Sequence, residues 1–139
     1  EKAMISKLKK IFLMIAGKAV QTYGMDLEEH QQLVLCAAEI MIEVYVAESA
    51  ILKAEKIAKL TSEKEVESQI AMAKLNLFYA IEKITMVGKE GIVYFSKGDE
   101  QRLLLMGLKR FTKYINMPNV IELRKTIATK VIDENKYCF

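Results

Sequence analysis

Three glutamates interrupt an otherwise apolar segment, and their spacing decides what chemistry they can do. Glu39, Glu43 and Glu48 lie within the run from Leu33 to Leu52. Glu39 and Glu43 are four residues apart, so on a helix they share one face, while Glu48 points elsewhere. Carboxylates are rarely buried without a partner, because desolvating a charge is costly. These glutamates must therefore reach water, a basic side chain or the surface of another protein.

Paired carboxylates on helices are also the ligands of di-iron centres, and the composition excludes that site. Such a centre needs Glu-x-x-His pairs from facing helices, and the chain has one histidine, His30, with Leu27 three residues before it. A closed zinc site of the common kinds is excluded too, because two cysteines and one histidine fall short of four ligands. We interpret His30, which stands beside Glu28 and Glu29, as a solvated residue in the first turn of a helix.

The glutamates are interpreted as interhelical ion-pair partners, with docking of another domain and chemistry as the alternatives. The nearby basic candidates are Lys53 and Lys56, and the distant candidates are Arg102, Arg110 and Arg124. The sequence therefore gives no catalytic, cofactor-binding or metal-binding residue. It gives a set of candidate interhelix or docking charges, which are Glu39, Glu43, Glu48 and Lys53.

The elements that must position these charges are long helices. Hydrophobic residues make up 52% of the 139 residues, with one proline and six glycines. So little turn chemistry favours a few long helices over many short strands. Apolar residues recur at helical spacing. The predicted ends and starts of the helices are marked by Gly24, by Pro118 and by two capping boxes (Asp26 with Glu29, Ser62 with Glu65). The expected helices run from Lys2 to Tyr23, from Leu27 to about Leu60, from Glu63 to about Phe95, from a cap at Asp99 to the break at Asn116-Met117-Pro118, and from Asn119 to about Asn135.

This order of helices predicts an all-α fold, an antiparallel up-down bundle of about four main helices plus a C-terminal helix, in a single domain over residues 1–139. The helix from Leu27 is apolar nearly all round in its middle, so it is expected to be the most buried element. Ala38, Ile42, Val46 and Ala50 are expected to face its neighbours. Replacing Leu35 or Ile42 by alanine should then cost about 2–5 kcal/mol.

Charge, cysteine content and the first residues narrow the class of protein. The net charge is +3 with both signs interspersed, which argues against a nucleic-acid partner. Cys36 and Cys138 are the only cysteines, and no signal peptide or membrane-spanning run is recognised, which favours a reduced, cytoplasmic protein.

The helical pattern is already under way at Met4 with no cap before it, so we expect a piece excised from the C-terminus of a longer chain.

One stretch also resembles a known family. The stretch comprises Gln31-Gln32-Leu33 and the run Ala38-Glu-Ile-Met-Ile-Glu-Val-Tyr-Val-Ala-Glu-Ser-Ala-Ile-Leu-Lys-Ala-Glu-Lys56. It resembles the C-terminal helical domain of acyl-CoA dehydrogenases, and is most similar to the extra C-terminal domain of the very-long-chain group in a bacterial form. The pattern is an acidic residue, an aliphatic residue and a tyrosine (Glu43-Val44-Tyr45), a run of mostly small residues, and a basic residue (Lys53). The resemblance covers most of the chain, from about Leu8 to Phe139.

The resemblance implies a non-catalytic domain of an FAD-dependent enzyme of fatty-acid β-oxidation. In that family, FAD and acyl-CoA are held by a catalytic core that precedes this domain, so the fragment itself is expected to bind no cofactor. Its implied roles are packing on that core, dimerisation or docking, with a homodimer as the expected assembly. A stand-alone helical interaction module is the alternative. A peripheral contact with the inner membrane through the lysine-rich first helix is a further alternative.

Overall fold

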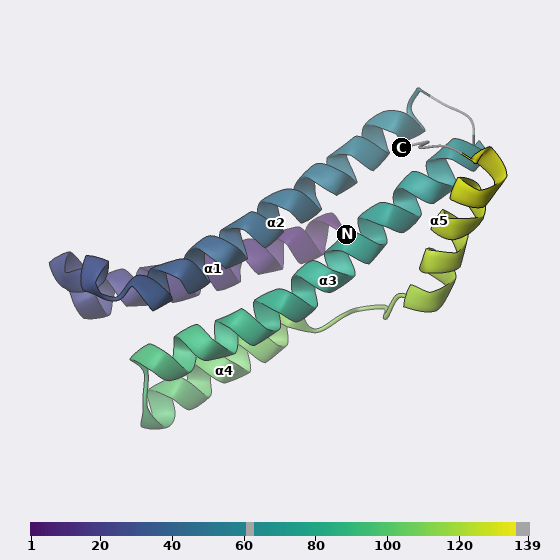
Figure 1. Cartoon of the computed structure of the whole chain (residues 1–139). Coiled ribbons are helices and arrows are strands. Elements are labelled where there is room, and N and C mark those ends of the chain that lie inside the picture. Colours follow the sequence, from purple (N-terminus) through teal and green to yellow (C-terminus); the bar gives the residue numbers. More distant parts are fainter. Residues whose placement is uncertain (61–62, 136–139) are drawn as a thin grey trace.

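The fold is described from a computed structural model, which describes residues 1–60 and 63–135. Within these ranges the chain forms five α-helices and one 3-10 helix and contains no strand, which confirms the predicted all-α bundle (Figure 1). The elements are α1 (Lys2–Tyr23), η1 (Gly24–Glu29), α2 (Gln31–Ala58), α3 (Glu63–Phe95), α4 (Gly98–Thr112) and α5 (Val120–Glu134).

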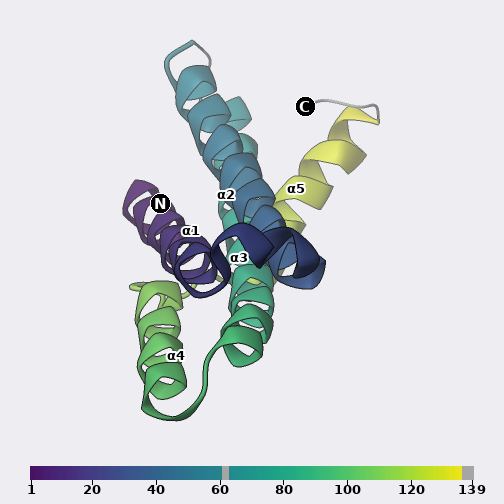
Figure 2. The same cartoon turned by 90° about the vertical axis from the view of Figure 1, so that its left-hand side faces the viewer.

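The first four α-helices alternate in direction, as an up-down bundle requires (Figure 1). α3 is the central helix, because it contacts α1, α2, α4 and α5, and it contacts α2 most extensively. Among the elements of the described chain, α2 contacts only α1, α3 and η1, so one of its faces has no neighbouring helix there (Figure 2). The prediction that α2 would be the most buried element was therefore wrong.

The core lies where α1, α2 and α3 meet. Its fully buried side chains come at helical spacing from all three helices, which is why three amphipathic segments collapse onto one another. They include Leu8, Ile11, Ile15, Leu33, Ile40, Ile81, Ile84 and Ile92. Leu108 of α4 closes the core from the side.

The start of α2 differs from the prediction. Gly24 ends α1 with φ of 52°, as expected, but the next residues form the separate helix η1 rather than the first turn of α2. His30 is the N-cap of α2, so Asp26 and Glu29 do not form its capping box. Likewise, Lys97 rather than Asp99 is the N-cap of α4. The predicted Ser62–Glu65 capping box lies outside the residues whose side chains the structure describes.

A glycine allows α3 and α4 to approach closely. A Cβ added at Gly88 would lie 3.0 Å from Cδ1 and 3.3 Å from Cδ2 of Leu108. Gly88 is thus a packing residue in the interior of α3, which continues to Phe95. The absence of a side chain at this position brings the buried Leu108 against the backbone of α3.

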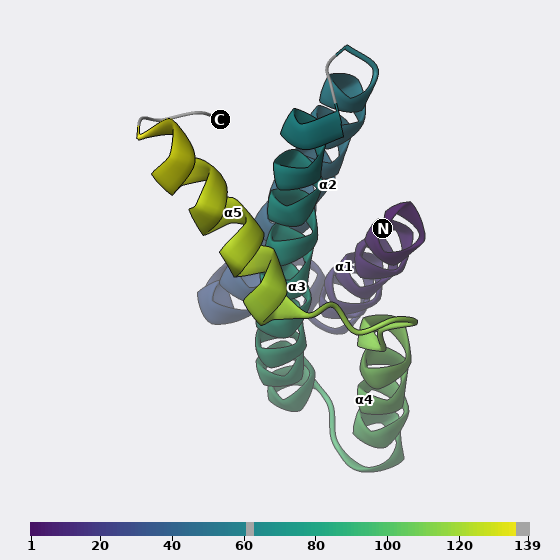
Figure 3. The ribbon, with the colours of Figure 1, turned by 90° about the vertical axis from the view of Figure 1, so that its right-hand side faces the viewer.

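α5 stands apart from the bundle. Of the elements within residues 1–60 and 63–135 it contacts only α3, and it diverges from the other helices toward its C-terminal end (Figure 3). Asn119 is its N-cap, with the side-chain Oδ1 accepting a hydrogen bond from the backbone N–H of Glu122 at 3.3 Å. Asn135 ends it in the left-handed conformation, so the predicted limits of this helix are confirmed.

Candidate interaction surface

Two of the three glutamates in the apolar segment share one lysine of α3. Lys83 Nζ lies 3.1 Å from Glu43 Oε1 and 3.7 Å from Glu39 Oε2. The hydrogen bond that Lys83 donates to Glu43, followed by the negative charges of Glu43 and Glu39, raises the pKa of the Lys83 ammonium group. A single cation thus sits between two carboxylates and stays protonated, which relieves the repulsion that their spacing creates.

Further ion pairs join α1 to its neighbours. Lys9 Nζ lies 2.7 Å from Glu48 Oε1, and Lys2 Nζ lies 2.8 Å from Glu55 Oε1. Both acidic partners belong to α2, so these two ion pairs link α1 to α2 at two points along their length. Lys18 pairs with Glu100 of α4 in the same way.

None of the basic partners suggested by the sequence holds these glutamates. Lys83 and Lys9 take that place, and both come from other helices. Lys53 is exposed, and no ion pair of its side chain is found among the described residues. Arg124 instead donates a hydrogen bond to the hydroxyl of Tyr79 and lies over its ring. The partners were missed because pairing across helices depends on how the helices are aligned, which residue spacing within one helix does not reveal.

Cys36 lies beside the acidic edge of α2 and α3. Partial burial, followed by the charges of Glu90 and Glu39, raises the pKa of the Cys36 thiol. It packs against the core and faces Gly91 of α3, whose added Cβ would lie 3.6 Å from the Cys36 Cβ. The thiol is therefore a poor nucleophile in this position.

An aromatic cluster closes one end of the bundle. His30 Nδ1 and the hydroxyl of Tyr94 are 2.8 Å apart, and the rings of Tyr23 and His30 are 3.7 Å apart between centroids. His30 is half-buried between these side chains, so its interpretation as a solvated first-turn residue was wrong. The three rings connect the ends of α1, α2 and α3.

A groove of about 570 Å³ opens between the start of α1, α3 and the segment that joins α4 to α5. Phe78 and Tyr114 stack in its wall, with ring centroids 5.8 Å apart. The hydroxyl of Tyr114 donates to the backbone carbonyl of Phe78 at 3.1 Å. Burial, followed by the charge of Glu82, raises the pKa of the Tyr114 hydroxyl, so it stays protonated and serves as a donor.

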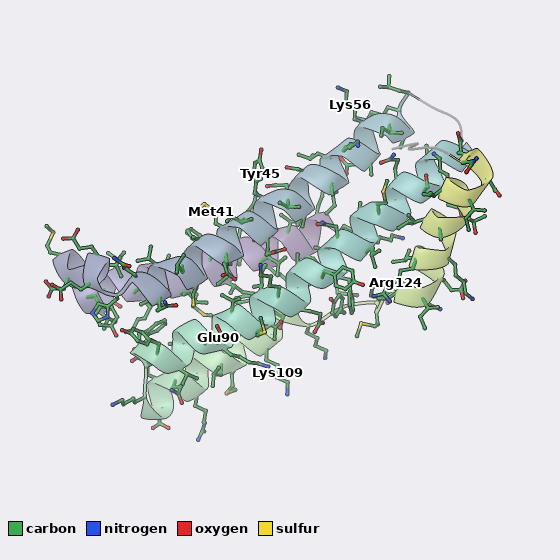
Figure 4. All side chains as sticks on the ribbon, in the orientation of Figure 1. Met41, Tyr45, Lys56, Glu90, Lys109 and Arg124 are labelled. Carbon is green, nitrogen blue, oxygen red and sulfur yellow. The ribbon has the colours of Figure 1, made fainter. Side chains whose placement is uncertain are left out.

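The outward side of α2 carries the largest set of exposed apolar side chains on any helix of the described chain. Met41 and Tyr45 project from α2 on the side remote from α3 (Figure 4). Ile42 is 58% exposed and Tyr45 is 71% exposed, although both belong to the segment expected to be buried. The exposed apolar residues of α2 are Val34, Leu35, Met41, Ile42, Tyr45, Val46 and Leu52.

This exposure corrects the predicted facing of α2. Ile42 and Val46 do not face neighbouring helices, while Ala38 and Ala50 are half-buried. The side that does face α1 and α3 carries Leu33, Ile40, Val44, Ala47, Ile51 and Ala54. α2 therefore has two apolar stripes on opposite sides, and one of them is uncovered.

Two searches of the described residues, for metal-binding clusters and for membrane-spanning helices, found none. No group of three or more metal-binding side chains is found among residues 1–60 and 63–135. In the same part of the chain, no helix combines the length and the apolar character needed to span a membrane.

Comparison with known proteins identifies the family. The family described as "Acyl-CoA dehydrogenase, C-terminal domain" matches residues 7–110, which is more than half of the chain. The chain belongs to the family of acyl-CoA dehydrogenase C-terminal domains. This acyl-CoA dehydrogenase C-terminal domain has the all-α bundle, the interhelical ion pairs and the uncovered face of α2 described above.

Two relatives that match almost the whole of this chain are much longer proteins. A "Probable acyl-CoA dehydrogenase" of Bacillus subtilis (strain 168) is 28% identical over 137 residues, which cover 99% of this chain and 23% of the relative. A crystal structure of acyl-CoA dehydrogenase complexed with FAD from Bacillus anthracis is 30% identical, with a TM-score of 0.93, over 99% of this chain and 24% of that one. The chain thus spans about a quarter of the length of these relatives.

Proposed function

We propose that this chain is the non-catalytic C-terminal helical domain of an FAD-dependent acyl-CoA dehydrogenase of fatty-acid β-oxidation, of the very-long-chain type. The proposal rests on the similarity to the Bacillus anthracis enzyme. That enzyme was solved with FAD, and the quarter of it that matches this chain has the same fold. In this proposal residues 1–139 form one domain of a longer polypeptide, and the catalytic core of that polypeptide is its partner.

The ion pairs formed by the glutamates of α2 support a non-catalytic role. Glu39 and Glu43 hold Lys83, and Glu48 holds Lys9. A catalytic base needs a cleft and a substrate within hydrogen-bond reach, whereas these carboxylates lie at helix edges and fasten α2 to α1 and α3. We therefore propose that they are interhelical ties. A docking role of the domain then falls to its exposed apolar surfaces, the outward side of α2 and the groove beside Tyr114.

The burial of the apolar residues of α1 argues against the alternative of a membrane contact through the first helix. The apolar stripe of α1 consists of Met4, Ile5, Leu8, Ile11, Ile15 and Ala19, and all six are buried in the bundle. An interfacial helix needs that stripe free to enter the lipid. A stand-alone helical interaction module remains the second candidate, and the exposed outward side of α2 is the observation that favours it.

The proposal is tested by comparing the parent polypeptide with this domain. The parent should purify with bound flavin and should reduce an electron-accepting dye in the presence of acyl-CoA. The 139-residue chain alone should show neither flavin absorbance nor dye reduction. Flavin that copurifies stoichiometrically with the 139-residue chain would contradict a non-catalytic role, and a parent without flavin would favour the stand-alone module.

A further inference from the structure

We propose that the groove beside Tyr114 holds the stretch of polypeptide that leads into this domain, namely the residues that directly precede Glu1 in the parent. The stretch lies there in extended form and places at least one large apolar side chain in the groove. The inference rests on the proposed function, which makes this chain the C-terminal part of a longer polypeptide.

The first residues of α1 form part of the wall of the groove. Glu1, Ala3 and Met4 line it together with residues of α3, of α5 and of the segment that joins α4 to α5. Residues joined to the backbone nitrogen of Glu1 therefore start beside the groove. A segment tethered so closely has an effective concentration on the order of millimolar near its point of attachment. This nearness favours the preceding stretch over a separate molecule as the occupant.

The segment that joins α4 to α5 offers unpaired backbone groups along the groove. It runs as an extended trace between Thr112 and Val120 (Figure 1). In the part of the chain that the structure describes, no hydrogen bond is found for the backbone groups of Ile115, Asn116 or Met117. Free backbone groups beside an apolar groove are what an extended peptide needs in order to bind by strand addition.

The side chains of the groove suit an apolar peptide. Ile115 and Met117 are 74% and 69% exposed, and both line the groove. The other apolar side chains of the lining include Met4, Leu77, Phe78, Pro118 and Leu123. Exposed apolar surface gathered in one place marks an interaction site. Burial of Ile115 and Met117 under an apolar side chain of the preceding stretch removes this surface from water.

The size of the groove selects an extended segment over a helix or a folded domain. Its volume is about 570 Å³. One helical turn with its side chains fills roughly 400–600 Å³, at a diameter of 10–12 Å and a pitch of 5.4 Å, so a longer helix does not fit. A stable contact with a folded domain covers roughly 800 Å² of each partner. The catalytic core is therefore left to the outward side of α2.

A smaller hollow offers the preceding stretch a competing path. Glu1 also lines a hollow of about 300 Å³ between α2 and α3, beside Ala54 and Ile70. The walls of this hollow are helices, whose backbone groups are already bonded within each helix. The hollow thus offers a peptide no backbone hydrogen bonds, whereas the larger groove beside Tyr114 does.

Limited proteolysis of the parent tests the inference. Ile115→Glu places a charge in the lining of the groove, so cleavage before Glu1 should become about tenfold faster, because the protease cuts the released stretch. Ile132→Glu is the matched control, since Ile132 is 75% exposed on α5 and does not line the groove. Ile70→Glu probes the hollow. Both of these variants should change the rate by less than about twofold. Mass spectrometry locates the cuts, and circular dichroism checks that the variants stay folded.

Urea denaturation gives a second measurement in the absence of the core. The 139-residue chain is compared with the same chain extended by about twelve of the residues that precede Glu1 in the parent, which span up to ~40 Å. The extension should raise the urea midpoint by about 0.5 M or more, because the bound stretch stabilises the folded state. Ile115→Glu should abolish this rise, and Ile132→Glu should preserve it.

Three results would overturn the inference. The first is an extension that leaves the urea midpoint of the unaltered chain unchanged. The second is an Ile115 variant that behaves in both measurements as the Ile132 variant does. The third is faster cleavage of the Ile70 variant than of the Ile115 variant, which would place the stretch in the hollow. None of these measurements involves flavin, so their failure is distinct from a parent without flavin, which would contradict the enzyme assignment.

Discussion

Two leucines of α1 provide a matched test of the packing. Leu8 is fully buried against α2 and α3, whereas Leu13, on the same helix, is 65% exposed. Leu8→Ala removes three carbon groups from the core, a loss of about 2.4 kcal/mol at ~0.8 kcal/mol each. The cavity that remains adds to this loss, so the free energy of unfolding should fall by about 2–5 kcal/mol. Leu13→Ala should change it by no more than about 0.5 kcal/mol.

Urea denaturation followed by circular dichroism measures both variants. At a denaturant slope of about 2 kcal/mol per molar, Leu8→Ala should lower the midpoint by roughly 1–2.5 M, and Leu13→Ala by less than about 0.3 M. Leucine and alanine have similar helix propensities, so intrinsic helicity does not separate the two variants. Equal losses at Leu8 and Leu13 would refute the arrangement of α1, because they would require its outward side to be covered as well.

Lys83→Met should lower the free energy of unfolding, and the loss should shrink as salt is added, since two carboxylates would face each other without their cation. Glu90→Gln should lower the pKa of the Cys36 thiol and so speed its alkylation at mildly alkaline pH, followed by mass spectrometry of the peptide. Because the folded pKa of Cys36 is raised, its contribution to stability is present below the ordinary thiol pKa and should be lost as the pH rises above it. Gly17→Ala, with open space at the added Cβ, should stabilise the chain by up to about 1 kcal/mol, whereas Gly88→Leu should destabilise it by about 1–3 kcal/mol; chemical denaturation distinguishes the signs.

Helix limits were well predicted where a local signal acts alone. The first helix, the third and the last were located from apolar spacing, with Gly24 marking the end of the first and the break at Pro118 preceding the last. The start of α2 was misplaced because Asp26 and Glu29 have the spacing of a capping box, yet they belong to a turn of 3-10 helix. The same spacing is compatible with a capping box and with a turn of 3-10 helix. The contacts of His30 with Tyr23 and Tyr94 favour a start of α2 at Gln31.

The exposure of α2 could not be read from its composition. A helix that is apolar nearly all round is normally buried, but here Ile40 faces the core while Ile42, two residues later, faces outward. The signal that could have revealed this was the seven-residue spacing from Leu35 to Leu52, which runs parallel to a separate buried stripe. Two complete stripes on one helix indicate two different neighbours, and a sequence does not say which of them belongs to the same chain.

The position of α5 has a consequence for the way the chain opens. In the part of the chain that the structure describes, α5 contacts α3 alone and none of its residues is fully enclosed, whereas α3 is held on several sides. The free energy needed to detach α5 is therefore smaller than that of global unfolding, and its backbone amides should exchange with deuterium through a local event. Residues in the middle of α3, such as Ile81 and Ile84, can exchange only when the whole bundle comes apart. The chain thus has two cooperative units of unequal stability, and the smaller one includes part of the wall of the groove beside Tyr114.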